Sequence, residues 1–124
     1  MSHKQILIVD DDDTVRATVE FSLEVTTNWK ILTACSGKEG LSLAQSKSPD
    51  LIILDVMMPV LDGIEVLQQL RTNISTQKIP VIFLTAKTLT QEQQKLKNLG
   101  VQGIISKPFD AINLEKQICL LLDW

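Results

Sequence analysis

Five polar residues lie at or just beyond the ends of apolar stretches, and their types suit one kind of chemistry. They are Asp10, Asp11, Asp55, Thr85 and Lys107. A carboxylate can attack a phosphoryl group and form an aspartyl phosphate. The transfer needs positioning and charge neutralisation, so an ammonium group and a hydroxyl near the phosphoryl oxygens would assist it. These residues would form a phosphoryl-accepting site if the fold brought them together.

The apolar stretches are predicted strands because they are continuous, which is typical of strands buried on both faces of a parallel sheet. The predicted strands are residues 5–9, 29–35, 51–54, 81–84 and 103–105. Segments between them repeat apolar residues every three or four positions, which predicts helices. The predicted helices are residues 14–26, 36–47, 64–71, 89–99 and a last one that follows Asp110. This alternation indicates an α/β fold, a flavodoxin-like doubly wound five-stranded parallel sheet in the order 2-1-3-4-5 flanked by five helices.

Short polar residues are expected to cap several of these helices. Asp12 or Asp13 suits the first helix as an N-cap, where an acid also complements the helix dipole. Ser36 and Glu39 have the spacing of a capping box. Asp110 is expected to cap the last helix.

The carboxyl ends of all five parallel strands lie along one edge of such a sheet, where ligands bind. Asp10, Asp11 and Asp55 should converge there, and together with Lys107 they carry a local charge of −2. Carboxylates that close together call for a cation, and oxygen ligands select a hard ion such as Mg²⁺. Asp55 stands alone at its strand end and is the predicted nucleophile, while Asp10 and Asp11 form the metal side.

Composition narrows the class of protein. The 124 residues, 44% of them hydrophobic, predict a single domain over residues 1–124. A net charge of −3 and the lack of any Lys/Arg run argue against direct nucleic-acid binding, and no apolar run approaches a membrane-spanning length. Cys35 and Cys119 lack metal-ligand spacing and are expected to be free thiols of a cytoplasmic protein.

Four motifs, in order along nearly the whole chain, resemble those of a two-component response-regulator receiver domain. They are Ile8–Asp11 (IVDD), Asp55–Pro59 (DVMMP) with Asp62-Gly63, Leu84–Ala86 (LTA) and Lys107–Phe109 (KPF). The resemblance implies that Asp55 accepts a phosphoryl group from the phosphohistidine of a sensor histidine kinase or phosphotransfer protein. The phosphorylated protein would then control a partner or output, without being a turnover enzyme.

The resemblance also assigns a metal site. Asp11 and Asp55 match direct ligands of Mg²⁺ or Mn²⁺, together with the backbone carbonyl of Met57. Asp10 matches the acid that holds the metal partly through water.

The same resemblance assigns residues to the phosphoryl group itself. Thr85 and Lys107 match the pair that contacts it and relays its presence. Met57 and Lys87 each follow a site residue by two positions, so their side chains could shade the phosphoryl group and set its lifetime.

One position departs from the family. Ile104 lies three residues before Lys107, where the family carries a switching Tyr or Phe. The aromatic flip cannot occur here. The predicted helix at residues 89–99 has few apolar residues to anchor it, so it is the expected bistable element of the surface formed by the fourth helix, fifth strand and fifth helix.

Two other functions are alternatives. Residues 10–15, DDDDTV, also fit the motif of haloacid-dehalogenase-like phosphatases, with Asp10 as nucleophile and Asp12 as general acid. That interpretation leaves Asp55 without a task, and the acidic pair that this family needs after its lysine is absent. The other alternative is an unphosphorylated receiver-like interaction module, which the presence of all five site residues disfavours. His3 is the single histidine, so a phosphohistidine must come from another protein.

Overall fold

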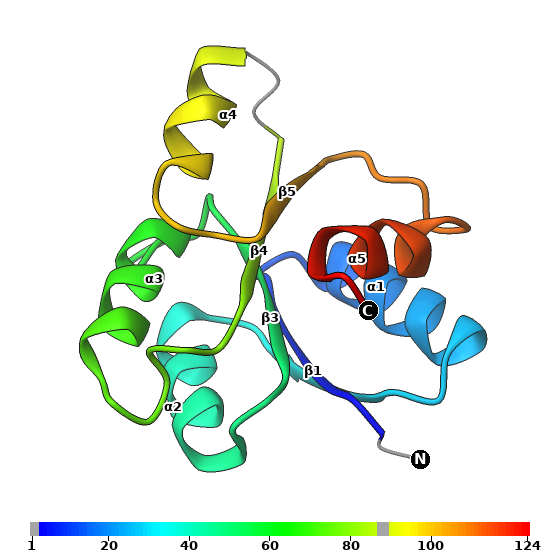
Figure 1. Ribbon diagram of the computed structural model, residues 1–124, viewed down its shortest axis with the longest axis horizontal. Helices are drawn as coiled ribbons and strands as arrows, with labels where there is room; N and C mark the ends of the chain where they lie inside the picture. Colours follow the sequence, from blue (N-terminus) through cyan, green and yellow to red (C-terminus); the bar gives the residue numbers. More distant parts are fainter. Residues whose placement is uncertain (1–2, 87–89) are drawn as a thin grey trace.

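The computed structural model describes residues 3–86 and 90–124, which form a five-stranded parallel sheet between two layers of helices (Figure 1). The strands are β1 (Gln5–Val9), β2 (Lys30–Ala34), β3 (Leu51–Asp55), β4 (Val81–Thr85) and β5 (Gly103–Ser106). The helices are α1 (Asp13–Thr26), α2 (Gly37–Lys47), α3 (Gly63–Thr72), α4 (Thr90–Lys97) and α5 (Leu114–Leu122). The strand order is β2-β1-β3-β4-β5, which confirms the predicted flavodoxin-like fold.

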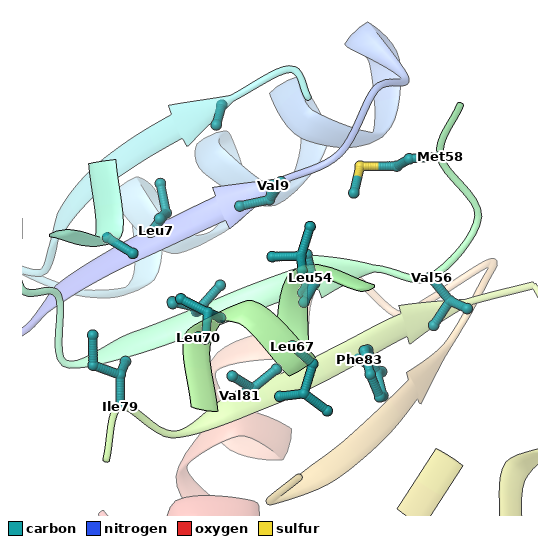
Figure 2. Packing of buried hydrophobic residues seen from close by; sticks show 14 of the residues in the cluster. Leu7, Val9, Leu54, Val56, Met58, Leu67, Leu70, Ile79, Val81 and Phe83 are labelled. Carbon is teal, nitrogen blue, oxygen red and sulfur yellow. The ribbon is translucent and has the colours of Figure 1, made fainter. Parts of the chain in front are cut away.

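The central strands are buried on both faces, as their continuous apolar sequences predict. One cluster of buried side chains lies beneath α2 and α3 and includes Leu7, Leu54 and Phe83 (Figure 2). The other lies beneath α1 and α5 and includes Ile8 and Ile53. Neighbouring residues of one strand therefore enter different clusters, because side chains alternate between the faces of a strand.

The register of the sheet brings the strand ends to one edge. Val9 pairs with Leu54 across β1 and β3, and Thr85 pairs with Ser106 across β4 and β5. The polar residues that end these strands are therefore held at the same height in the sheet by its backbone ladder.

Several helix starts follow the predicted chemistry. Asp12 caps α1, and its Oδ1 accepts hydrogen bonds from the backbone of Thr14 and Val15. Ser36 Oγ accepts from Glu39 N, but the Glu39 carboxylate accepts from Cys35 N, so half of the expected capping box forms.

The predicted cap of the last helix is wrong. The structure starts α5 at Leu114, with Asn113 as the N-cap residue. Asp110 Oδ1 instead accepts from the backbone N–H of Ile112 at 3.0 Å, and its Oδ2 accepts from the Asn113 side chain at 2.7 Å. These local bonds close a turn ahead of the helix, which is the competition that short acidic side chains offer to helical structure.

α4 is the least anchored of the helices over their described residues. Thr90–Lys97 buries one side chain, Leu96, and Gln93 Nε2 donates to Ser106 Oγ at 3.1 Å. The helix is followed by Gly100, whose φ of 84° favours glycine. Leu89, the predicted first residue, lies outside the described residues.

An aromatic contact ties the end of α5 to the amino edge of the sheet. The Trp124 and Trp29 rings meet edge to face, with centroids 5.4 Å apart, and Lys4 Nζ lies 4.5 Å from the Trp124 ring centroid. Trp29 directly precedes β2, so this contact lies at the opposite end of the sheet from Asp55.

None of the helices described is long and apolar enough to cross a membrane.

Candidate functional site

Three carboxylates gather at the carboxyl edge of β1 and β3. Asp10 and Asp11 follow β1, and Asp55 is the last residue of β3. One oxygen from each lies within 4.8 Å of the others. Asp10 and Asp55 are buried, at 0% and 2% exposure, while Asp11 is exposed. The predicted convergence of these three residues is confirmed.

Lys107 reaches the same cluster from the end of β5. Its Nζ lies 3.0 Å from Asp10 Oδ2 and 3.2 Å from Asp55 Oδ1. Its backbone N–H donates to the Thr85 carbonyl at 2.7 Å, which links the lysine to β4. Lys107 therefore joins the two buried carboxylates through one ammonium group.

The remaining predicted residues surround this cluster to different degrees. Thr85 is fully buried at the end of β4. Met57 donates its backbone N–H to Asp55 Oδ1 at 3.3 Å, while its side chain is 62% exposed. Lys87, expected to shade the phosphoryl group, lies outside the described residues.

The site perturbs the acid–base properties of its own groups. Burial, and then the charge of Asp10, raise the pKa of Asp55 to about 6, against the opposing influence of Lys107 and the Met57 N–H. Burial lowers the pKa of Lys107, but the hydrogen bond and charge of Asp10, aided by Asp55, raise it overall. The lysine is thus held as a cation, and Asp55 is an unusually basic carboxylate.

The donor set fits a hard divalent cation. Asp10 Oδ2 is buried, and in the described part of the chain it faces the Lys107 ammonium at 3.0 Å. Three carboxylates against one ammonium leave an excess of negative charge among oxygen donors alone. Carboxylate oxygens in this number suit Mg²⁺ or Mn²⁺.

Arg16, which the sequence analysis did not identify, supports the metal side from α1. Its guanidinium donates to the backbone carbonyl of Asp10 at 2.8 Å and to the Asp13 carboxylate. Asp12 N donates to Asp10 Oδ1 at 2.8 Å. Hydrogen bonds to the side chain and to the backbone carbonyl of Asp10 therefore fix the loop after β1. An arginine one turn inside a helix that follows an acidic run was the available signal.

The loop from Val56 to Asp62 begins and ends against the backbone of Asp55. Gly63 N donates to the Val56 carbonyl at 2.9 Å. A Cβ on Gly63 would lie 2.3 Å from the Asp55 carbonyl oxygen, so no side chain fits there. Asp62 and Glu65 form a full capping box that starts α3. Contacts at both of its ends therefore fix the conformation of this loop.

The phosphatase alternative is not favoured. Asp12, its general acid, is the N-cap of α1 and accepts hydrogen bonds from that helix. Asp55, to which the phosphatase alternative assigns no role, belongs to the carboxylate cluster with Asp10 and Asp11.

Comparisons with known proteins agree with this geometry. The family profile described as "Response regulator receiver domain" matches residues 6–119. Alkaline phosphatase synthesis transcriptional regulatory protein PhoP of Bacillus subtilis is 37% identical over 97% of this chain and 49% of its own length. Response regulator Rre1 of Synechocystis is 38% identical over 94% of this chain and 51% of its own length. The chain thus spans about half the length of the curated relatives it matches.

Solved structures share the whole fold. The chemotaxis response regulator CheY4 of Vibrio cholerae superposes with a TM-score of 0.88 at 32% identity, over 97% of this chain and 99% of that one. A putative response regulator from Chloroflexus aurantiacus gives a TM-score of 0.89 at 29% identity, over 99% of this chain and 100% of that one.

Proposed function

The chain belongs to the response regulator receiver domain family, which serves two-component phosphorelay signalling, and from that membership we propose that Asp55 is its phosphoryl acceptor. The observation that supports this assignment is the buried cluster in which Asp55 contacts Lys107 and lies beside Asp10 and Asp11. We propose one receiver domain over residues 1–124, acting in the cytoplasm.

Each site residue has a role in the proposed transfer. An Asp55 carboxylate oxygen forms a bond to phosphorus while the bond between phosphorus and the donor's imidazole nitrogen breaks, and that nitrogen keeps the electron pair. Lys107 exchanges part of its ion pair for a contact with the phosphoryl oxygens, and the Thr85 hydroxyl donates a hydrogen bond to them. Asp10, Asp11, Asp55 and the Met57 carbonyl would hold Mg²⁺ or Mn²⁺, which supplies positive charge beside the acceptor.

The proposed donor is a sensor histidine kinase or phosphotransfer protein. His3 is exposed, and its Nδ1 lies 3.2 Å from the carbonyl of Asn28, at the edge of the sheet opposite Asp55. The chain's own histidine therefore cannot serve as the donor within the same molecule. The receiver itself is proposed to contact protein rather than nucleic acid, and its downstream target is an output domain or a separate protein.

In this proposal α4 transmits the conformational change from the phosphorylated site to the protein surface. Ile104, at the position of the family's aromatic switch, is partly buried and packs against the cluster that contains Leu96 of α4. With a single buried anchor, α4 can shift when Thr85 and Lys107 engage the phosphoryl group. The surface of α4, β5 and α5 would change with it.

Labelling with a small donor tests the proposed acceptor. Treatment with acetyl phosphate and Mg²⁺ should add one phosphoryl group at Asp55, located by mass spectrometry after borohydride reduction. Asp55→Asn should remove the label while the circular dichroism spectrum stays native. Label at Asp10, or steady hydrolysis of a phosphate monoester, would contradict the proposal. A chain that takes up neither phosphate nor beryllofluoride would instead be an unphosphorylated interaction module.

A further inference from the structure

Val60 is in an unusual conformation on the loop beside Asp55. Its φ is 68°, and the Leu61 N–H donates to the Pro59 carbonyl at 2.7 Å, which closes a three-residue turn around it. A positive φ is a genuine outlier for a β-branched residue, and a three-residue turn of this hand is strained. Glycine would adopt the same turn without that strain.

Folding gives no reason for valine at this position. The Val60 side chain is fully exposed, so it buries no apolar surface that could offset the strain. Its neighbour Leu61, by contrast, packs against the hydrophobic cluster beneath α2 and α3. A strained residue with an exposed apolar side chain indicates a use outside the folded chain itself.

This side chain belongs to the loop that follows the acceptor residue Asp55. At one end of the loop the Met57 N–H donates to the Asp55 carboxylate, and at the other end the Gly63 N–H donates to the Val56 carbonyl. Asp55 is almost completely buried, so a protein-borne phosphohistidine must approach closely over the surrounding loops. On the β1 side these carry exposed acids, Asp11 to Asp13, whereas the β3–α3 loop carries exposed Met57 and Val60.

We propose that the Val60 side chain packs against an apolar side chain of the histidine-bearing donor protein and so determines which donor is accepted. This inference rests on the proposed function, and it concerns recognition of the protein donor rather than the chemistry. A small donor such as acetyl phosphate does not reach across the loop, so Val60 should matter for protein donors alone.

The test compares two phosphoryl donors on the same variants. The protein donors are the phosphoacceptor domains of the source organism's histidine kinases, autophosphorylated with radiolabelled ATP, and the small donor is acetyl phosphate. Val60→Asn, which tolerates a positive φ but presents a polar side chain, should slow transfer from the protein donor about tenfold, as loss of one apolar contact allows. The rate with acetyl phosphate should stay within about twofold, since the reacting groups are untouched.

Two further variants serve as controls. Val60→Ile keeps an apolar β-branched side chain and should retain transfer from the protein donor. Ile74→Asn removes another highly exposed apolar side chain from the α3–β4 loop, at the other edge of the sheet, and should leave both rates unchanged.

The outcomes separate this inference from the proposed function. Equal slowing with both donors by Val60→Asn would show a structural role for the loop and overturn the inference, as would unchanged transfer from the protein donor. It is also overturned if acetyl phosphate labels the wild-type chain but none of the kinase domains does. Failure of acetyl phosphate to label Asp55 would instead overturn the proposed function.

Discussion

The buried position of Asp55 favours its neutral form, and this should make the free energy of unfolding depend on pH. Its pKa is raised to about 6, so the folded protein binds a proton more tightly there than the unfolded chain does. The contribution of Asp55 to stability therefore falls as pH rises from about 4 to about 6. The loss reaches up to about 3 kcal/mol in metal-free protein at neutral pH.

Asp55→Asn should accordingly stabilise the metal-free protein by about 1–3 kcal/mol at pH 7.5, because it removes the buried charge at nearly constant volume. The gain should shrink as pH falls from 6 toward 4, where Asp55 itself becomes neutral. Urea denaturation at several pH values measures both effects. Glu24→Gln, which changes an exposed carboxyl group of α1, is the matched control. A gain that persists unchanged at pH 4 would contradict this explanation.

Lys107 is the cation that lets two buried carboxylates stand side by side. Lys107→Met should lower the unfolding free energy of the metal-free protein by about 2–4 kcal/mol, since Asp10 and Asp55 would then face each other without compensation. Millimolar Mg²⁺ should restore most of that loss by binding the native state. Thermal unfolding with Mg²⁺ and with EDTA measures this, with Lys47→Met, an exposed lysine of α2, as the control. Equal destabilisation in both buffers would argue against a metal site here.

At the scale of elements, the loop between β3 and α3 is fixed at both ends and strained in its middle. Val60→Gly should relieve the strain and raise stability by about 1 kcal/mol, despite the greater freedom of glycine in the unfolded chain. Chemical denaturation provides the measurement. Loss of stability in this variant would mean that Val60 is not strained in solution.

The helices differ in how many residues they bury against the sheet, and α4 buries the fewest over the described residues. Amide hydrogen exchange should be faster in residues 90–97 than in the middle of α1 or α3, because α4 has one buried side chain while α3 buries four of its residues. Beryllofluoride with Mg²⁺ should change exchange in α4 and β5 if α4 is the bistable element. Changes confined to the loops around Asp55 would exclude α4 from the output path.

At the scale of the whole molecule, much of the fold could be predicted because local and global signals agree. Short continuous apolar runs such as residues 51–54, bounded by polar residues, favour a doubly covered strand, and parallel topology then brings Asp55 and Asp10 to one edge. The start of α5 could not be predicted, since Asp110 and Asn113 are both residue types that cap helices. In the structure Asp110 closes a turn with Asn113, and α5 begins at Leu114 without a side-chain capping bond.

The side-chain cluster at the carboxyl edge was predictable in its members but not in its contacts. Residue types and strand ends identify the acids and Lys107, whereas the bridge from Lys107 to Asp10 and Asp55 depends on distances that only the assembled sheet sets. Arg16 follows an acidic run, which indicates an ion pair nearby, but its contact with the backbone carbonyl of Asp10, six residues away, could not be read from that pattern.

The edge-to-face pair of Trp29 and Trp124 gives the molecule an optical probe at a useful place. The chain has two tryptophans and no tyrosine, so nearly all of its near-ultraviolet emission comes from this pair. The pair lies a strand length, about 16 Å, from the carboxylate cluster, too far for direct quenching by a bound ion. Titration with Mg²⁺ should leave the emission spectrum unchanged, and a shift on adding beryllofluoride would report that the end of α5 has moved. The fluorescence of the unmodified protein should therefore report the response of the domain while being insensitive to metal occupancy of the site.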